Sequence, residues 1–270
     1  MAQDSKIEWT NHTANLWSGC TKVHEGCDNC YAETLSHRWG NDVWGNDKPR
    51  KLVKKVWADL ARFQKTASVA GEVHRVFVGS MMDIFEKSMP LIDGKGNEIV
   101  VEQEDDFARR LLTGDLRQQL FNNITVGLYP NLMFLLLTKR PSNINKHIPE
   151  SWKVNPPENV MFGISLSCEK NVKDLFPHFV KVRGRKFLSV EPQIESIDLA
   201  EPNEKYGYPI HHIDRVIQGG ESGHHRRPFN IKWAYEMKEV CEIAKVPFFF
   251  KQIDKIKQIP EDLLIRQFPK

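Results

Sequence analysis

The sequence predicts an α/β fold, a partial (open) β/α barrel of six to seven parallel strands. Short apolar runs recur along the later two-thirds of the 270-residue chain, and amphipathic stretches with helical spacing separate them. Most of these runs are continuously apolar rather than alternating, as in strands that helices cover on both faces. Regular alternation of strands and helices indicates right-handed βαβ units around one parallel sheet.

The strands are predicted from these apolar runs. A short first strand is expected near Asn15–Ser18, ahead of the regular alternation. Counting it gives six or seven β/α units, fewer than the eight of a closed barrel. The later strands are expected at Val76–Gly79, Leu132–Leu137, Val160–Ile164, Lys186–Val190, Arg215–Ile217 and Pro247–Phe250.

Three stretches with apolar residues at helical spacing are predicted as helices that cover the sheet. They are Lys51–Lys65, Asp105–Asn123 and Ile231–Lys245. Residues 91–103 contain an Asp-Gly-Lys-Gly turn signal and are interpreted as an excursion on the barrel rim. Since no repeat or low-complexity linker interrupts the pattern, we expect a single domain over residues 1–270.

Composition limits the function classes. A net charge of +3, from 38 basic and 35 acidic residues, does not by itself indicate a nucleic-acid-binding protein. No run approaches the roughly 18 apolar residues of a membrane span, and the N-terminus lacks an apolar signal stretch. We therefore expect a cytoplasmic protein with no membrane partner. Three of the five cysteines lie within eleven residues, which favours a metal or redox site over a disulfide scaffold.

The cysteine cluster is the strongest chemical signal. Cys20, Cys27 and Cys30 have the spacing C-x6-C-x2-C. Three thiolates can hold three irons of a [4Fe–4S] cluster and leave the fourth iron open to a ligand. Gly19 and Gly26 permit a tight loop, and Asp28 is expected to cap a helix over residues 29–39. The amides of its first turn would favour the negative charge of thiolates.

A zinc site is the alternative interpretation of the same residues. Three cysteines with His24 or His37 make a Cys3His donor set, and C-x2-C is common in such sites. The protein would then be a non-enzymatic module that binds nucleic acid or a host protein. The strand–loop–helix position and the barrel that follows favour the cluster. A cluster protein that binds nucleic acid without turnover is a third hypothesis.

Polar residues follow the predicted strands, one group per strand. Because functional groups of β/α barrels collect at the carboxyl ends of the strands, we expect these groups to converge. The candidate site residues are Gly79, Ser80, Asp83, Thr138, Lys139, Arg140, Ser165, Ser167, Cys168, Glu191, Gly219 and Gly220; Glu221 and Lys251 also follow strands.

These features together resemble the radical S-adenosylmethionine superfamily, most members of which use the shorter spacing C-x3-C-x2-C. The chain is most similar to a family of phage and bacterial proteins with a three-Cys motif. That resemblance spans nearly the whole chain, in Trp17–Cys20, Cys27–Glu33, Phe77–Ser80 with Asp83, Leu137–Pro141, Leu188–Pro192, Gly219–Gly223 with Arg227–Pro228, and Phe249–Gln252.

The resemblance implies an enzyme that uses a [4Fe–4S] cluster to cleave S-adenosyl-L-methionine. The 5′-deoxyadenosyl radical so formed would abstract hydrogen from an unknown substrate, and a flavodoxin or ferredoxin would supply the electron. For the cofactor, it implies that Gly79, Ser80 and Asp83 hold the amino group. Because the carboxylate of the cofactor is an anion, the cation Lys139 or Arg140 would hold it.

The residues after the later strands are expected to contact the other parts of the cofactor. Ser165 and Ser167 suit the ribose, Glu191 the cofactor, and the Gly219–Gly220 backbone the adenine. Cys168 at the cavity mouth is a candidate hydrogen-atom donor, although free cysteines are more often buried apolar residues.

Partners follow from the basic and aromatic residues and from the resemblance. The stretch His224–Arg227 would meet phosphates of a nucleic-acid substrate, and Tyr31, Trp39 and Trp44 would stack bases. Some relatives are encoded beside a partner protein, so a genomically adjacent partner is also expected.

Overall fold

The structure, a computed structural model, describes residues 5–101 and 108–269. Seven strands form the main sheet in the order β1-β4-β8-β9-β10-β11-β12. The pairings of this sheet that lie within the two units described below are all parallel. The predicted α/β partial barrel of six to seven parallel strands is thereby confirmed. Residues 102 and 103 of the predicted rim excursion lie outside the described residues.

The chain divides into two compact units, which are described separately. The first contains residues 1–22, 32–136 and 147–149, and the second contains residues 23–31, 137–146 and 150–270. The single domain expected over residues 1–270 stays a prediction. None of the helices in the described ranges has the length and apolar character that a membrane crossing requires.

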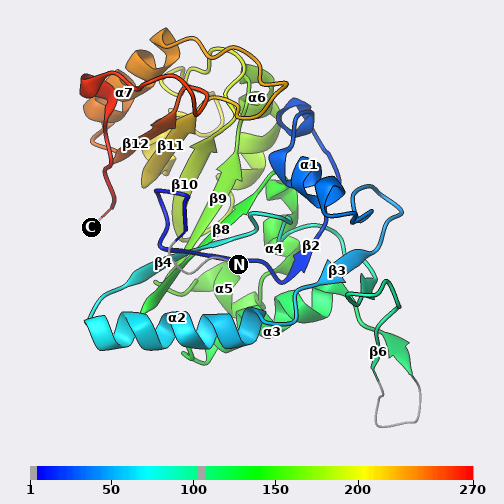
Figure 1. Cartoon of the computed structure of the whole chain (residues 1–270). Coiled ribbons are helices and arrows are strands. Elements are labelled where there is room, and N and C mark those ends of the chain that lie inside the picture. The colour runs from blue at the N-terminus through cyan, green and yellow to red at the C-terminus, as the bar shows by residue number, and fades with distance from the viewer. Residues whose placement is uncertain (1–4, 102–107, 270) are drawn as a thin grey trace. The chain divides into compact units, whose positions relative to one another are not determined.

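The first unit contains the strand order β1-β4-β8 (Figure 1). Helix α2 packs on β1 and β4 and ends at Gly71, whose φ of 66° is the left-handed conformation of a helix terminus. The elements are β1 His12–Ala14, β2 Trp17–Ser18, α1 Tyr31–Arg38, β3 Arg50–Leu52, α2 Val56–Ala70, β4 His74–Val78, β5 Leu91–Ile92, β6 Val100–Val101, β7 Arg109–Arg110, α3 Thr113–Thr125 and β8 Leu132–Thr138.

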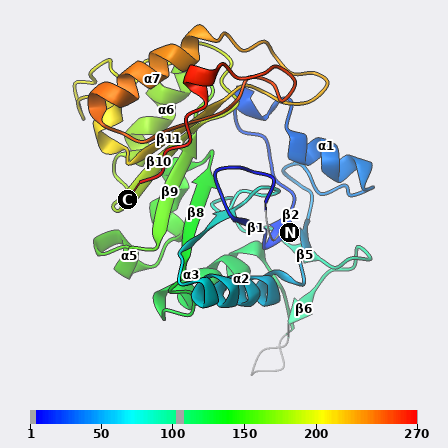
Figure 2. The same cartoon turned by 60° about the vertical axis from the view of Figure 1, so that its left-hand side comes forward.

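The second unit contains β9 to β12 in sequence order, with α6 and α7 alongside (Figure 2). Helix α7 packs on β11 and β12, and its inner face buries Ala234, Met237 and Cys241 as its spacing predicts. The elements are η1 Glu25–Cys27, η2 Pro141–Asn143, α4 Ile144–His147, α5 Glu150–Val154, β9 Val160–Ser165, α6 Glu169–Phe179, β10 Arg185–Val190, η3 Pro209–His212, β11 Arg215–Gly219, α7 Lys232–Ala244, β12 Phe248–Gln252 and η4 Glu261–Leu263.

Boundaries differ from the sequence-based expectations at the first strand and at three helices. Helices α2 and α3 begin at Val56 and Thr113 rather than at Lys51 and Asp105, because residues 50–52 form β3 and residues 109–110 form β7; residues 105–107 lie outside the described residues. The first strand of the main sheet is His12–Ala14, whereas Trp17–Ser18 pairs antiparallel with β3 in a separate small sheet. The helix after the cysteines begins at Tyr31, and Asp28 ends the 3-10 turn η1 instead of capping that helix. At the first strand and at the cysteine segment, the observed structure depends on tertiary contacts that the local pattern does not encode.

Candidate functional site

The cysteine segment of the second unit, residues 24–30, is built around η1. His24 accepts a hydrogen bond at Nδ1 from the Gly26 amide at 3.0 Å, and its carbonyl accepts one from the Cys27 amide at 2.8 Å. Cys27 is buried and Cys30 is half-buried, directly ahead of α1. Two cysteines are therefore presented by a turn whose amides are already paired.

Gly26 packs against Ser167, which lies just beyond the carboxyl end of β9. A Cβ at position 26 would come within 2.1 Å of Ser167 Oγ, so only glycine fits this approach. Ser167 itself is fully buried, and within the described residues its hydroxyl has no hydrogen-bond partner. A buried hydroxyl without a partner is uncommon, and it leaves Ser167 with an unused hydrogen-bonding group at this position.

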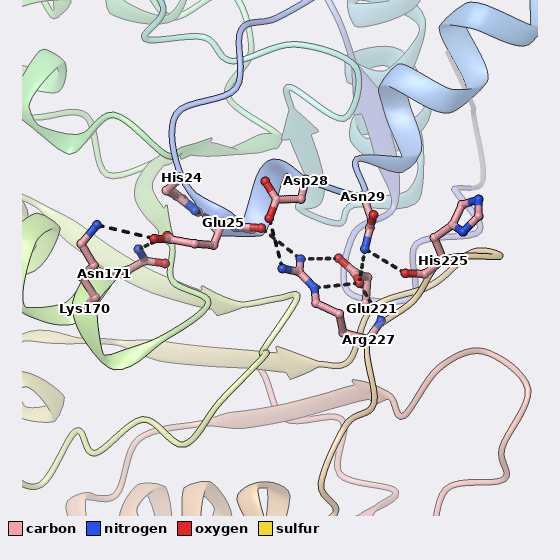
Figure 3. Close-up of polar contacts among 10 residues, drawn as sticks. His24, Glu25, Asp28, Asn29, Lys170, Asn171, Glu221, His225 and Arg227 are labelled. Atoms are coloured by element: carbon pink, nitrogen blue, oxygen red, sulfur yellow. Dashed lines mark hydrogen bonds and ion pairs between the residues drawn. The ribbon is translucent and has the colours of Figure 1, made fainter.

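Glu25 and Asn171 join the cysteine segment to the start of α6 (Figure 3). Asn171 donates from Nδ2 to Glu25 Oε2 at 3.4 Å and accepts from the Ser167 amide at 3.0 Å. Lys170 lies 3.5 Å from Glu25 Oε1. One asparagine thus bridges the cysteine segment and the carboxyl end of β9.

Cys168 is buried at the N-cap position of α6. Burial raises the pKa of its thiol, and the charges of Glu25 and Glu195 raise it further. The amides of Asn171 and Lys170 have the opposite effect, which is smaller. Cys168 is therefore a protonated thiol at neutral pH.

Cys30 shares its surroundings with the carboxyl end of β10. The pKa of the Tyr31 phenol is raised by burial of its hydroxyl and then by the charges of Cys30 and Glu191. Glu191 forms an ion pair with Lys251 of β12, and its carbonyl accepts from Ser165 Oγ at 2.9 Å. The predicted residues Ser165 and Glu191 are thus in direct contact.

The glycines after β11 are closely packed. Gly220 donates its amide to Gln252 O at 3.0 Å and accepts at its carbonyl from Gln252 Nε2 at 2.9 Å. A Cβ at Gly220 would lie 2.0 Å from Ile253 O. The carbonyl of Gly219 accepts from the Gln193 amide at 3.0 Å. Both carbonyls and the Gly220 amide are therefore already paired within the protein.

In the first unit, the loop that carries Cys20 is held by a buried ion pair. Arg50 donates to Glu86 Oε2 at 2.9 Å from Nε and to Oε1 at 2.7 Å from Nη2, and the two side chains are 0% and 2% exposed. Arg50 also donates to Thr21 Oγ1 at 2.9 Å. The Gly45 amide donates to Cys20 O at 3.0 Å. The backbone around Cys20 is therefore held by hydrogen bonds at Cys20 O and at the neighbouring side chain of Thr21.

The residues after β4 are also ordered by side-chain contacts. Asn15 donates from Nδ2 to Ser80 Oγ at 2.8 Å and accepts from the Met81 amide at 2.8 Å. Asp83 is buried and accepts at Oδ1 from the Phe85 amide at 2.9 Å. Gly79 has a φ of 107° and donates its amide to Ala14 O at 3.1 Å.

The cations after β8 are less enclosed. Thr138 is buried and accepts at Oγ1 from the Arg140 amide at 2.8 Å, while Lys139 and Arg140 are half-buried. Their side chains therefore stand at a strand end with part of their surface accessible to an anionic ligand.

The two histidines named as possible zinc ligands are not available for that role. Because His24 accepts a hydrogen bond at Nδ1, its proton is on Nε2, and neither nitrogen then offers a lone pair to a metal. His37 lies in α1 and is exposed. Across the described part of the chain, no three His, Cys, Asp or Glu side chains form a ready metal-binding group. That finding includes the cysteines, whose thiolates are soft donors suited to zinc and to cluster irons alike.

Sequence reasoning missed the polar residues that support the cysteines. They are Glu25, Asn29, Arg50, Glu86, Asn171 and Arg227. Their partners are remote in sequence, as in the Asn29–Glu221 hydrogen bond across 192 positions. The signals available were that Asn29 lies between two cysteines and that Arg227 belongs to a basic stretch; neither indicated a supporting role.

The fold and this site define a class: an α/β partial-barrel protein in which a cysteine segment packs at the carboxyl ends of the parallel strands. The chain belongs to the family described as "protein of unknown function (DUF5131)", whose model matches residues 4–262. Among curated proteins, none has a sequence that matches this chain.

The fold is similar to that of spore photoproduct lyase. A cysteine-to-serine variant of that enzyme superposes with a TM-score of 0.52 at 12% identity, over 93% of this chain and 79% of the lyase chain. A tyrosine-to-phenylalanine variant has a TM-score of 0.43 at 14% identity, and the match spans 58% of that chain. A complex of the lyase with dinucleoside spore photoproduct also has a TM-score of 0.43, at 15% identity.

Proposed function

We propose that the protein is a radical S-adenosylmethionine enzyme whose [4Fe–4S] cluster is held by Cys20, Cys27 and Cys30. The observation that carries the proposal is the close approach of Gly26 to Ser167, which seats the Cys27–Cys30 turn at the carboxyl end of β9. The fold shared with spore photoproduct lyase supports the assignment to this superfamily. When bound, the cluster and S-adenosyl-L-methionine supply a 5′-deoxyadenosyl radical for hydrogen abstraction.

The residues of the chain bind and orient the cofactor. Gly79, Ser80 and Asp83 follow β4 and are proposed to hold the amino group. Lys139 and Arg140 are proposed to pair with the carboxylate, because they are half-buried cations at a strand end. The remaining cofactor contacts are proposed for Thr138, Ser165, Ser167, Glu191, Gly219 and Gly220.

Cys168 is proposed to return a hydrogen atom to the product radical. Donation of a hydrogen atom requires a thiol rather than a thiolate, and burial keeps Cys168 protonated. The S–H bond of Cys168 would break as the product C–H bond forms, leaving a sulfur radical that one electron from the external donor and one proton from solvent return to the thiol. A flavodoxin or ferredoxin suits that task.

Nucleic acid or a nucleotide is the proposed substrate class. Trp39 is 64% exposed and suits base stacking, whereas Trp44 is 8% exposed and does not. His224 and His225 are exposed, but Arg227 is engaged by Glu221. A cytoplasmic location and a genomically adjacent partner protein complete the proposal.

Anaerobic reconstitution tests the cluster. The protein is expected to bind about four irons, to absorb near ~400 nm and to release 5′-deoxyadenosine with dithionite. Alanine at Cys20, Cys27 or Cys30 is expected to abolish all three properties, whereas Cys241→Ala, a change in the core of α7, serves as the matched control. One tightly bound zinc without colour would identify the zinc module instead.

The role of Cys168 has its own readout. Cys168→Ala is expected to keep its iron and its substrate-independent release of 5′-deoxyadenosine, because the thiol acts after that release. Loss of iron from this variant would make Cys168 a ligand and refute the donor role.

A further inference from the structure

A second Arg–Glu pair holds the cysteine segment to the loop after β11, entirely within the second unit (Figure 3). Arg227 donates to Glu221 Oε1 at 2.7 Å from Nη2 and to Oε2 at 3.1 Å from Nε. The Arg227 amide donates to Glu221 Oε2 at 2.8 Å. This two-pronged geometry fixes the plane of the guanidinium, which a lysine cannot reproduce.

The same guanidinium reaches the cysteine segment. Nη2 donates to Glu25 O at 3.0 Å, and Nη1 lies 3.4 Å from Asp28 Oδ2. From the other side, Asn29 Nδ2 donates to Glu221 Oε2 at 2.9 Å and to His225 O at 2.8 Å. These four contacts therefore involve Glu25, Asp28 and Asn29, all of which belong to the cysteine segment.

Both members of the pair are charged at neutral pH. Burial raises the pKa of the Glu221 carboxyl, but hydrogen bonds from Arg227 and Asn29 lower it by more. The hydrogen bond to Glu221 raises the pKa of Arg227. Glu221 is 5% exposed, so an uncompensated charge there would be costly.

We propose that Arg227 and Glu221 are positioning residues that hold Cys27 and Cys30 in their ligating arrangement before any iron binds. The proposal rests on the proposed function for what the cysteines bind, but the order it describes belongs to the apoprotein. Ordering the segment in advance removes part of the entropy cost of ligand assembly, so the cluster is retained longer.

Hydrogen exchange of the apoprotein tests the ordering directly. The reporters are the amides of Gly26, Cys27 and Asp28, which close the turn onto His24 and Glu25. Arg227→Met is expected to speed their exchange about ten- to a hundred-fold, because one or two hydrogen bonds that secure the turn are lost. Arg227→Lys is expected to rescue little, since it keeps the charge but not the fork.

Two further variants exclude a general effect of removing an arginine and the failure of Arg227→Met to fold. Arg226→Met is the matched control, because Arg226 contacts Asp254 and Gly223 O rather than the cysteine segment. Asn29→Ala removes the contact with Glu221 from the segment side and leaves the Arg227–Glu221 pair intact, so it reports even if Arg227→Met fails to fold. Unchanged exchange in Asn29→Ala and in a folded Arg227→Met would overturn the proposal.

Iron retention provides the second readout. Reconstituted Arg227→Met is expected to lose iron to a chelator at least ten-fold faster than the parent and the Arg226→Met control, following the faster opening of the turn. Equal rates would refute a role in retention. If the parent protein takes up no iron, the proposed function fails, whereas the exchange experiment still decides whether Arg227 orders the segment.

Discussion

The buried Arg50–Glu86 pair allows a sharp energetic prediction about the loop that carries Cys20. Arg50 makes six hydrogen bonds, two of them to Glu86 and the others to Val43 O, Lys48 O, Gly45 O and Thr21 Oγ1. Both side chains are almost completely buried. Removing one member therefore leaves a charge without its partner in a region of low dielectric constant.

The magnitude follows from that geometry. Glu86→Met should cost about 3–5 kcal/mol of unfolding free energy, the range for a broken buried pair. That is a large fraction of the ~5–15 kcal/mol of a typical domain. Arg50→Met should cost at least as much, because the three carbonyls also lose their donor. The double variant should cost less than the sum, by about 2 kcal/mol, since no charge is left unpaired.

Urea unfolding of the apoprotein, followed by circular dichroism, measures the four free energies of this cycle. Hydrogen exchange at Gly45, whose amide donates to Cys20 O, localises the effect to the cysteine loop. The matched control is Arg109→Met, because Arg109 pairs with Asp115 by two similar hydrogen bonds on the surface. A coupling below about 0.5 kcal/mol, or a control as destabilising as Glu86→Met, would refute the reasoning.

Three further predictions concern packing and pH. Gly26→Ala should cost about 1–3 kcal/mol in thermal or urea unfolding, because its Cβ would lie 2.1 Å from Ser167 Oγ, and Ser167→Gly in the same chain should restore part of the loss. Burial raises the pKa of Cys241 to about 12, so above the unfolded value of 9.0 only the unfolded chain releases this proton. Stability should therefore fall from pH 9 towards 12 by up to about 1.4 kcal/mol per pH unit, and less in Cys241→Val; an equal slope would contradict this. Asn15→Ala should cost about 1–2 kcal/mol in urea unfolding, since Ser80 loses a hydrogen bond, and a cost near zero would exclude a structural role.

The sheet was predictable where burial is continuous. The apolar runs at β9 and β10 predicted strands to within one residue of their observed ends, because both faces of these strands are buried. The first strand was not predictable, since His-Thr-Ala has no strand signature. His12 is buried there because its ring stacks on Phe63 with centroids 4.0 Å apart. The burial of His12 in the first strand therefore depends on a residue that is remote in sequence.

The candidate site divides in the same way. That polar residues follow the ends of the strands could be predicted from local sequence, whereas their roles and those of the cysteines stay predictions. Their supporting partners could not, because a buried Arg or Glu carries no local mark of its partner. Arg50 and Glu86 are 36 positions apart, and nothing near either residue indicates the other.

The surroundings of each cysteine in this chain determine the pKa of its thiol and therefore its reactivity. Cys241 lies in an apolar core that disfavours the thiolate, so its raised pKa makes it inert. Cys168 stands at a helix N-terminus, where amides favour the thiolate, yet burial and the nearby carboxylates prevail. One of those carboxylates is Glu25, whose own pKa is lowered first by a backbone hydrogen bond and then by Asn171. The cysteine segment thus carries a charge that adds to the effect of burial in raising the pKa of Cys168, so the geometry of this segment and the protonation of the candidate donor are linked through Glu25.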